Sequence, residues 1–446
     1  MCRPPPATEL TGTPAVPTEK HGLTDTKADY ASLPAVTVAR QRRRVIVCDL
    51  ARLSAMTVGG HCFKNALASL QPLLHLGAAR YGALMAAIGA PGATVTPLLG
   101  GLAFDAHPKR AATTFAFVAL LGGAICSMGL VQGSPAAVLA GGVVLGVGHG
   151  CLVVASRAIA SERKKDQAYA QGVLAAFANL GAWAGRAAAA PLALRSGTVA
   201  APLAAALAVQ TLSLGAAASA STGTATCHKG NSDCPFFASQ RYWLVAGAHA
   251  AVFAAFKVFE QFSSAIFVQR FAYDVRTAGL MASSVPLLSA ALAPYAGRLA
   301  DRASAYKRDA CTALALGAAA LAVGGLCLKV THSTLVACIG VVSLGHAVLP
   351  TLLLARLRGA LGTSPSLGVA FGACEALAAG AHVFANLAFA HLHAERAYAG
   401  AMGLLAGLLA LGFVLFVRSA ALGVPPSDRR RGGSPVSPSS LPVMLV

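Results

Sequence analysis

The chain has 446 residues, of which 56 % are apolar and only 11 % are Asp, Glu, Lys or Arg. Soluble domains carry about 25 % charged residues, so a chain this poor in charge cannot cover a water-facing surface of its size. The composition argues against a soluble enzyme, a disordered scaffold and a fibrous protein. The formal charge of +19 does not indicate nucleic-acid binding either, because the basic residues form short clusters between long apolar runs. A membrane protein that crosses the bilayer several times is the interpretation left.

The first residues of the chain are polar, rich in Pro and Thr, and lack the apolar stretch of a signal peptide. We expect residues 1–44 to be a disordered cytosolic tail that ends in the basic run Arg40-Gln41-Arg42-Arg43-Arg44. Within it, Tyr30-Ala31-Ser32-Leu33 has the form of a sorting signal for lysosome-like organelles. Residues 419–446 are again rich in Pro, Ser and Arg, and we expect a second disordered tail there.

Between the tails lie twelve long apolar segments. A helix needs about 20 apolar residues to cross the hydrocarbon layer, and single runs of this length fit helices rather than barrel strands. Gly and Ala recur throughout, as is typical where helices pack closely in lipid. The predicted spans are 45–70, 80–104, 111–131, 136–158, 169–193, 198–220, 242–269, 277–299, 310–330, 334–357, 368–392 and 396–418. The sequence therefore predicts an all-α membrane protein with twelve transmembrane helices.

The distribution of Lys and Arg tests this count. With both termini in the cytosol, 22 Lys and Arg fall on the cytosolic side and 6 on the other. Arg157, at the end of the fourth segment, is counted with the cytosolic loop that follows it. One miscounted helix would invert every later loop and erase the bias, so the contrast favours twelve spans and cytosolic termini.

The sequence gives no sign of a metal site or of catalysis. The eleven cysteines are scattered, and no pair has CxxC spacing. The one cluster of possible ligands, Cys227, His228 and Cys234, lies in a polar loop, where we favour the absence of a metal. No set of nucleophile and base appears. We therefore expect neither an enzyme nor a cofactor, and no nucleic acid as a partner.

The chain contains an internal repeat. Gly101-Leu102-Ala103-Phe104-Asp105 follows the second segment, and Gly297-Arg298-Leu299-Ala300-Asp301-Arg302 follows the eighth. The two Asp residues are 196 positions apart, and the first and seventh segments begin 197 positions apart. This shared offset predicts two six-helix pseudo-repeats in the same orientation. They are residues 45–220 and 242–418, joined by a cytosolic loop at 221–241.

The repeated pattern, a Gly followed four residues later by an Asp and then by basic residues, resembles the signature of the major facilitator superfamily. The Gly lets a helix end pack closely, and the Asp can accept hydrogen bonds at the N-terminus of a neighbouring helix or pair with the basic residues. We expect these residues to form a cytosolic clasp that holds one conformation and releases it in the other. The clasp residues are Gly101, Asp105, Lys109, Arg110, Gly297, Asp301, Arg302, Lys307 and Arg308.

A closer resemblance is to the lysosomal dipeptide transporters of the family of major facilitator superfamily domain-containing protein one. It is carried by Cys62-Phe63-Lys64-Asn65-Ala66-Leu67, Gly146-Val147-Gly148-His149-Gly150-Cys151-Leu152, Ser284-Val285-Pro286, Pro294 and Asp301. The chain departs from the family at Lys64 and Gly150, where acidic residues are typical, and at Asn179, where an Arg is typical. The resemblance implies the twelve-helix fold, dipeptide transport in lysosomes and a glycosylated accessory membrane subunit.

Ionisable residues inside the spans indicate a central cavity, because each costs roughly 2.5–3.5 kcal/mol on insertion scales and needs a cavity or a partner. The three acids are Asp49, Glu260 and Glu375, and the other groups are Arg52, His61, Lys64, His149, Arg186, His249, Lys257, His346 and His382. They fall on the first, fourth, fifth, seventh, tenth and eleventh segments. In the family that the chain resembles, these helices line the cavity, and the third, sixth, ninth and twelfth pack outside it.

Nine residues are our candidates for binding a substrate. They are His61, Lys64, Asn65, His149, Asn179, Lys257, Glu260, His346 and Glu375. Lys257 and Glu260 lie one helical turn apart and form either a pair that a substrate or proton can break or a permanent ion pair. Lys64 either meets a substrate carboxylate or extends to the membrane surface.

The histidines and Glu375 leave similar alternatives. His149 and His346 either titrate during transport or are neutral residues hydrogen-bonded between helices. Glu375 either cycles a proton or is the partner of a cavity cation.

We therefore expect a secondary active or facilitative transporter that works by alternating access. Its expected partners are a small-molecule solute and the lipid bilayer that contains it. The excess of Lys and Arg over acids in the interior favours a solute with a carboxylate, such as a dipeptide, an amino acid or an organic acid. Two alternatives stay open. One is a transporter of a sugar, nucleoside or drug, and the other is a membrane receptor or assembly factor that transports nothing.

Overall fold

The structure, a computed structural model, describes residues 35–74, 78–161, 166–219, 235–328, 331–361 and 366–422. The chain divides into two units, residues 1–48 and 49–446. In the first unit only the backbone from residue 35 is described, as the start of helix α1. The sorting-type sequence at 30–33, the Cys and His cluster at 227–234 and most of both predicted tails lie outside the described residues.

The described residues form thirteen α-helices, two short 3-10 helices and no strand. They are α1 (Ala35–Leu70), α2 (Ala78–Gly89), η2 (Ala90–Ala93), α3 (Thr96–Ala106), α4 (Pro108–Gln132), α5 (Pro135–Ser161), α6 (Gln167–Ser196), α7 (Ala200–Ser219), η3 (Pro235–Ala238), α8 (Gln240–Phe271), α9 (Val275–Arg302), α10 (Ala305–Gly325), α11 (His332–Leu361), α12 (Leu367–Ala394) and α13 (Tyr398–Ala421). The all-helical class predicted from the sequence is confirmed.

A helix lies at every one of the twelve predicted segments. Eight of the described helices are long and apolar enough to cross a membrane by length and composition alone, namely α4, α5, α7, α8, α9, α11, α12 and α13. The long helices outside this group include α1 and α6. These carry Arg52, Lys64 and Arg186, charges that lower the hydropathy of a helix.

The second predicted span, 80–104, is not one helix. It is broken into α2, η2 and α3, with Thr94 in an extended conformation between η2 and α3. Pro91 and Pro97 lack the N–H that a continuous helix needs, and Gly89 and Gly92 add backbone freedom beside them. The Thr94 hydroxyl donates to the carbonyl of Pro91 (2.6 Å) and satisfies one of the acceptors that the break frees.

The first helix begins earlier than predicted. α1 starts at Ala35, ten residues before the expected start at 45, so the predicted tail 1–44 overlaps a helix. Basic residues end an apolar span, but Arg and Gln are good helix formers, and no Gly or Pro lies between residues 35 and 58. The charge pattern located the edge of the apolar segment and not the end of the helix. At the predicted loop 221–241, η3 and the start of α8 occupy the last residues.

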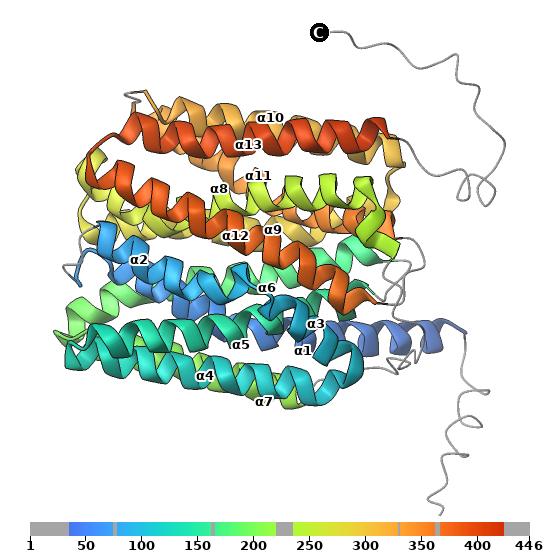
Figure 1. The fold of residues 1–446 in the computed structure, drawn as a ribbon, viewed down its shortest axis with the longest axis horizontal. Helices are drawn as coiled ribbons and strands as arrows, with labels where there is room; N and C mark the ends of the chain where they lie inside the picture. The colour runs from blue at the N-terminus through green and yellow to red at the C-terminus, as the bar shows by residue number, and fades with distance from the viewer. Residues whose placement is uncertain are drawn as a thin grey trace, which may run out of the picture. The chain divides into compact units, whose positions relative to one another are not determined.

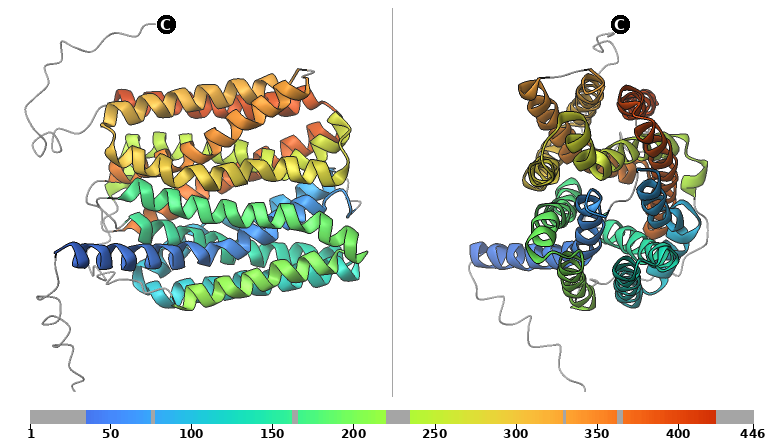
Figure 2. Two further views of the ribbon diagram at one scale, coloured as in Figure 1. Left: turned by 180° about the vertical axis from the view of Figure 1, so that it is seen from behind. Right: turned by 90° about the vertical axis from the view of Figure 1, so that its left-hand side faces the viewer.

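In the unit 49–446 the helices lie side by side with their axes roughly parallel (Figure 1). Figures 1 and 2 show α8 to α13 gathered on one side and α2 to α7 on the other, the arrangement expected of two six-helix halves. The halves meet where α6 packs on α9 and where α12 packs on α2 and α3. That these groups are independent six-helix domains stays a prediction.

Four helices lie on the outside of the bundle and expose large apolar side chains. Phe117 of α4, Leu212 of α7, Leu321 of α10 and Leu411 of α13 are all exposed. A water-soluble protein rarely exposes so much apolar surface, whereas lipid accommodates it. These are the third, sixth, ninth and twelfth spans of the prediction.

Candidate substrate-binding cavity

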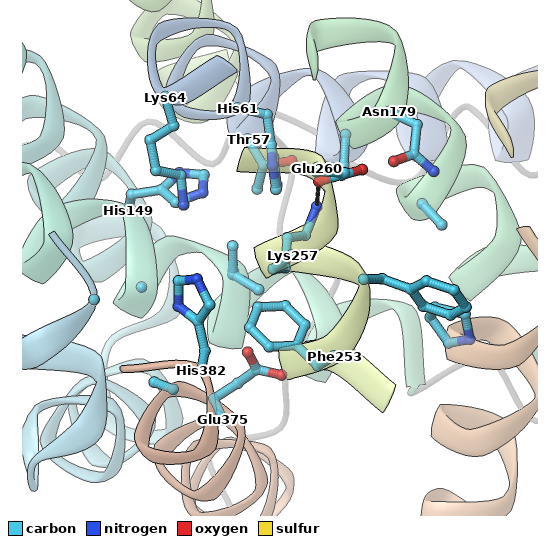
Figure 3. A pocket seen from close by; sticks show the side chains of 18 of the residues that line it. Thr57, His61, Lys64, His149, Asn179, Phe253, Lys257, Glu260, Glu375 and His382 are labelled. Atoms are coloured by element: carbon cyan, nitrogen blue, oxygen red, sulfur yellow. Dashed lines mark hydrogen bonds and ion pairs between the residues drawn. The ribbon is translucent and has the colours of Figure 1, made fainter. Parts of the chain in front are cut away.

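A cavity of about 190 Å³ lies between the two groups of helices. Its lining residues come from α1, α2, α3, α5, α6, α8, α11 and α12, and no described residue of α4, α7, α9, α10 or α13 contributes. All nine candidate residues line it: His61, Lys64, Asn65, His149, Asn179, Lys257, Glu260, His346 and Glu375. Figure 3 shows His61, Lys64, His149, Asn179, Lys257, Glu260 and Glu375 around the same space. The structure brings the candidates together; that they contact a substrate stays a prediction.

Glu260 of α8 is the most enclosed acid of the cavity, with only 2 % of its surface exposed. Its Oε2 accepts a hydrogen bond from Lys257 Nζ at 2.7 Å, as their spacing of three residues predicts (Figure 3). Its Oε1 lies 3.2 Å from His346 Nε2, an ion-pair distance, without the alignment of a hydrogen bond. Both oxygens of Glu260 therefore face a basic group.

His346 of α11 is held on its other side as well. Its Nδ1 lies 3.0 Å from the hydroxyl of Ser289, which in turn donates to the carbonyl of Ser343 at 3.0 Å. The ring also meets the edge of Phe256, with 5.2 Å between the centroids. These contacts fix the orientation of the imidazole and tie α8, α9 and α11 together.

Glu375 of α12 is paired with Arg157 of α5. Arg157 Nη1 also lies 3.4 Å from His249 Nε2, so the pair is bounded by a third polar group from α8. Arg157, counted from the sequence with the cytosolic loop, lies within α5 and pairs with an acid of the cavity. Arg157 lies in the last turns of α5, and Glu375 is more than two hundred residues away in the sequence. Counting Lys and Arg along the chain does not detect such a pair.

Several polar side chains of the cavity lining have no hydrogen-bond or ion-pair partner among the described residues. They include the amine of Lys64 on α1 and the amide of Asn179 on α6. Lys64 lies beside His149 of α5 (Figure 3). Together they present N–H donors to the cavity.

His149 is 3 % exposed, and neither of its ring nitrogens has a hydrogen-bond partner within the described structure. The ring of His61 meets it edge-on, with 4.6 Å between the centroids. Gly60 allows this approach, because a Cβ at that position would overlap the ring of His149. A buried polar group without a partner is costly, so a ligand or water at this wall would stabilise it.

Arg186 of α6 lies behind the wall, only 1 % exposed. Its Nε donates to Asn65 Oδ1 at 2.7 Å and its Nη1 to Ser263 Oγ at 3.0 Å, and its Nη2 donates to the backbone carbonyl of Glu260. Asn65 Nδ2 donates to the carbonyl of His61 at 2.9 Å. The guanidinium thus joins α1 and α6 to α8 and fixes the amide of Asn65, while no described carboxylate pairs with it.

The cavity also contains polar residues that were not candidates. His382 Nε2 lies 3.2 Å from Gln261 Oε1, and both residues line the space. His382 is among the ionisable groups inside the predicted spans, which was the available signal. Gln261 carries no charge, and no sequence signal separates it from other polar residues of α8.

The two Asp residues of the internal repeat lie at one end of the bundle, which we call the clasp end. Asp105 at the end of α3 accepts hydrogen bonds from the backbone N–H groups of Gly368 (3.0 Å) and Val369 (3.3 Å), in the first turn of α12. Asp301 at the end of α9 accepts from Ala168 (3.0 Å) and Tyr169 (2.8 Å), in the first turn of α6. Each carboxylate therefore caps a helix N-terminus in the other half of the molecule.

The remaining clasp residues have different environments. Gly101 and Gly297 lie where helices cross, and a Cβ at either would overlap backbone atoms of α12 or α6. Arg110, Arg302 and Lys307 are exposed, Arg308 is half-buried, and the side chain of Lys109 lies outside the described ones. Among the described side chains no ion pair joins these cations to Asp105 or Asp301. The clasps are made by carboxylates and backbone N–H groups.

The other end of the bundle is also closed by contacts between the halves. Tyr81 of α2 meets Phe262 of α8 edge-on, with 5.5 Å between the ring centroids. Asn386 Nδ2 of α12 donates to the carbonyl of Gly82 at 3.3 Å. The cavity lies between these contacts and the clasps.

Residues 53–327 match the family model of the Major Facilitator Superfamily. The chain belongs to the major facilitator superfamily. Its fold is similar to that of the human organic anion transporter MFSD10 (TETRAN), with a TM-score of 0.64 and 17 % identity over 82 % of this chain and 99 % of that one. A variant of the E. coli fucose:proton symporter FucP gives a TM-score of 0.60 and 13 % identity, over 83 % and 98 %. No curated protein sequence matches the chain.

Membership in this superfamily confirms a multi-pass membrane protein with a transporter fold. At these low sequence identities, the similarity to the two solved structures shows only that the fold is shared. It does not identify the substrate of this major facilitator protein.

Proposed function

We propose that this protein carries a small carboxylate-bearing solute across its membrane by alternating access. The observation that carries the proposal is the ammonium of Lys64, which faces the cavity without an acidic partner among the described residues. An unpaired charge at a membrane cavity is costly, and a carboxylate is the group that pairs with it best. Asn179 and His149 offer further donors to the same anion.

An amino group on the solute would find both acids of the cavity already paired with basic residues. Glu260 is engaged by Lys257 and His346, and Glu375 by Arg157. A dipeptide or amino acid would have to displace one of these cations, whereas a carboxylate meets Lys64 directly. The resemblance to lysosomal dipeptide transporters supports a dipeptide, and the organic anion transporter MFSD10 is a fold neighbour. Both solute classes stay within the proposal.

Contacts between the halves at both ends of the cavity support alternating access. The Asp105 and Asp301 caps hold the clasp end, and the contact between Tyr81 and Phe262 holds the other. Solute enters or leaves when one set breaks while the other persists. We place the clasp end in the cytosol, because the Lys and Arg excess lies there. A lysosomal location and a glycosylated accessory subunit belong to the same proposal and rest on the resemblance alone.

The test is uptake into proteoliposomes with a labelled panel of alanylalanine, alanine, lactate, succinate and fucose, at several internal pH values. We expect uptake of at least one carboxylate and none of fucose. The combined variant Lys64→Ala, Lys257→Ala and Glu375→Gln should abolish it, while the exposed Arg276→Gln should not. Wild-type uptake surviving in the combined variant would remove the proposed site, and fucose uptake would favour the other solute classes.

A membrane receptor or assembly factor that transports nothing is the remaining alternative. A packed interior would have favoured it, whereas the structure has a polar cavity. A protein that binds a panel member in detergent yet moves no member in proteoliposomes would favour this alternative.

A further inference from the structure

The interior holds more cations than acids, and the pairing of these groups leaves two of the cations over. Lys64, Arg157 and Lys257 line the cavity and Arg186 lies behind its wall. The acids of the cavity are Glu260 and Glu375. Lys257 is paired with Glu260 and Arg157 with Glu375, which leaves Lys64 and Arg186 without a carboxylate among the described residues.

No described carboxylate lies within ion-pair distance of either remaining basic group. Arg186 donates to an amide, a hydroxyl and a backbone carbonyl, which satisfy its hydrogen bonds but carry no charge. Lys64 has no hydrogen bond among the described residues. The cavity histidines add no negative charge in either protonation state, so titration of His61, His149, His346 or His382 only increases the surplus.

The net charge of the solute should therefore affect its binding, in addition to the presence of a carboxylate. A zwitterion brings a carboxylate to Lys64 but adds a new cation to an interior in which the basic groups already outnumber the acids by two. A solute with two carboxylates brings as many negative charges as the interior lacks. In a site of low dielectric constant this difference dominates recognition, because unpaired buried charges are disfavoured.

We propose that the cavity selects a small dianion, of the dicarboxylate class, over zwitterions and monoanions of the same length. This inference rests on the proposed function and narrows its substrate class. Lys64 is the specificity-determining contact, with His149 beside it and Asn179 across the cavity as further donors (Figure 3). Arg186 acts through Asn65 and through its charge, so it is a positioning residue.

The experiment uses four solutes with the same chain length: succinate, its half-amide succinamate, the neutral succinamide and the zwitterion 4-aminobutyrate. Binding to the purified full-length protein is measured by ligand-induced thermal stabilisation, which needs no transport. We expect succinate to bind about tenfold more tightly than succinamate and 4-aminobutyrate, and succinamide not to bind. Flux of the same solutes into proteoliposomes is measured separately.

Two substitutions move the charge balance in opposite directions. Lys64→Gln removes one surplus cation and should lower the ratio of succinate to succinamate affinity about tenfold, and Lys64→Met gives the same result if Gln perturbs the wall. Glu375→Gln frees Arg157 and should raise that ratio. Arg276→Gln removes an exposed cation at the start of α9, outside the cavity, and should leave the ratio unchanged.

The outcomes separate this inference from the proposed function. Binding of 4-aminobutyrate as tight as that of succinate overturns the inference, as does an equal loss of all ligands in Lys64→Gln, or no stabilisation by succinate. If succinate binds with the expected ratios but no solute crosses the membrane, the charge selectivity stands and the transport proposal fails. If alanylalanine crosses while succinate neither binds nor crosses, transport stands and the dianion inference is wrong.

Discussion

Glu260 is the residue on which most of the interior contacts converge. Its carboxylate faces Lys257 and His346, and its backbone carbonyl accepts from Arg186 and Ser263. Two cations from α8 and α6 thus approach one residue from different sides. Because Glu260 is almost completely buried, removing a partner leaves a charge that water cannot reach.

The substitution Lys257→Gln should destabilise the protein by about 3–5 kcal/mol, because it leaves the carboxylate of Glu260 without its ion-pair partner. The double variant Lys257→Gln with Glu260→Gln should recover most of this loss, since the buried charge is then gone. Thermal unfolding of the purified variants measures both. A double variant no more stable than the single one would show that the pair is not the origin of the effect.

Arg186→Lys keeps the charge behind the cavity but loses the planar arrangement of donors that reaches Asn65, Ser263 and Glu260. We expect solute affinity to fall about tenfold, because the amide of Asn65 is no longer fixed. Arg195→Lys is the matched control, since Arg195 lies exposed near the end of the same helix. Equal affinity in the two variants would contradict a positioning role.

The helices that meet at the clasp end depend on close approach of their backbones. Gly101 of α3 lies against Gly368 of α12, and Gly297 of α9 lies against Ala168 of α6. Each crossing brings an Asp to the N–H groups of the opposite helix. The two capping contacts are related by the internal repeat, so the same device occurs once in each half.

Gly101→Ala should prevent full closure of the clasp end, because its methyl group would overlap the backbone of Gly368. We expect faster labelling of a cysteine placed at Asn179, in a cysteine-free background, by a membrane-impermeant reagent added on the clasp side. Gly317→Ala in α10 is the control, since a Cβ there meets nothing within 4 Å. Labelling as slow as in the parent protein would show that the crossing tolerates the methyl group.

In the molecule as a whole, the cavity is bounded by contacts between the halves at both ends. The clasps hold one end, and Tyr81, Phe262, Gly82 and Asn386 meet at the other. Contacts between the halves are thus present at both ends of the cavity at once. The alternating access proposed above would require each set of contacts to break in turn.

Tyr81→Ala should weaken the end opposite the clasps, because it removes the ring that packs on Phe262. The same cysteine at position 179 should then react faster with reagent added on that side and no faster from the clasp side. Phe117→Ala, on the exposed face of α4, controls for loss of an aromatic ring elsewhere. Equal acceleration from both sides would indicate general loosening instead of opening at one end.

Much of this architecture could be predicted from the sequence because charge is rare in it. The apolar segments contain few ionisable residues, among them Glu260, Lys257 and His346. Such a residue usually faces a cavity or a partner of opposite charge. The offset between Asp105 and Asp301 predicted the repeated clasps, since both positions recur in step with the helices.

Other features could not be predicted, for physical reasons. Arg157 looks like a loop cation, and only the folded chain brings it to Glu375. Arg186 was recognised as a buried cation, but its partners are neutral acceptors that leave no pattern in the sequence. The break in the second span follows from Pro91 and Pro97, yet prolines also occur inside continuous helices here, as Pro286 does in α9.

That break has a mechanical consequence. α2 contributes Tyr81 and Gly82 to one closure, and α3 contributes Gly101 and Asp105 to the other, so a single membrane crossing takes part in both. A continuous helix would transmit any tilt from the contacts at one end of the cavity to those at the other. The 3-10 helix η2 interrupts the helical hydrogen bonds between α2 and α3, and such a break can act as a hinge. Under the proposed alternating access, this break would let α2 and α3 tilt separately, so that one end of the cavity could open while the contacts at the other end persist.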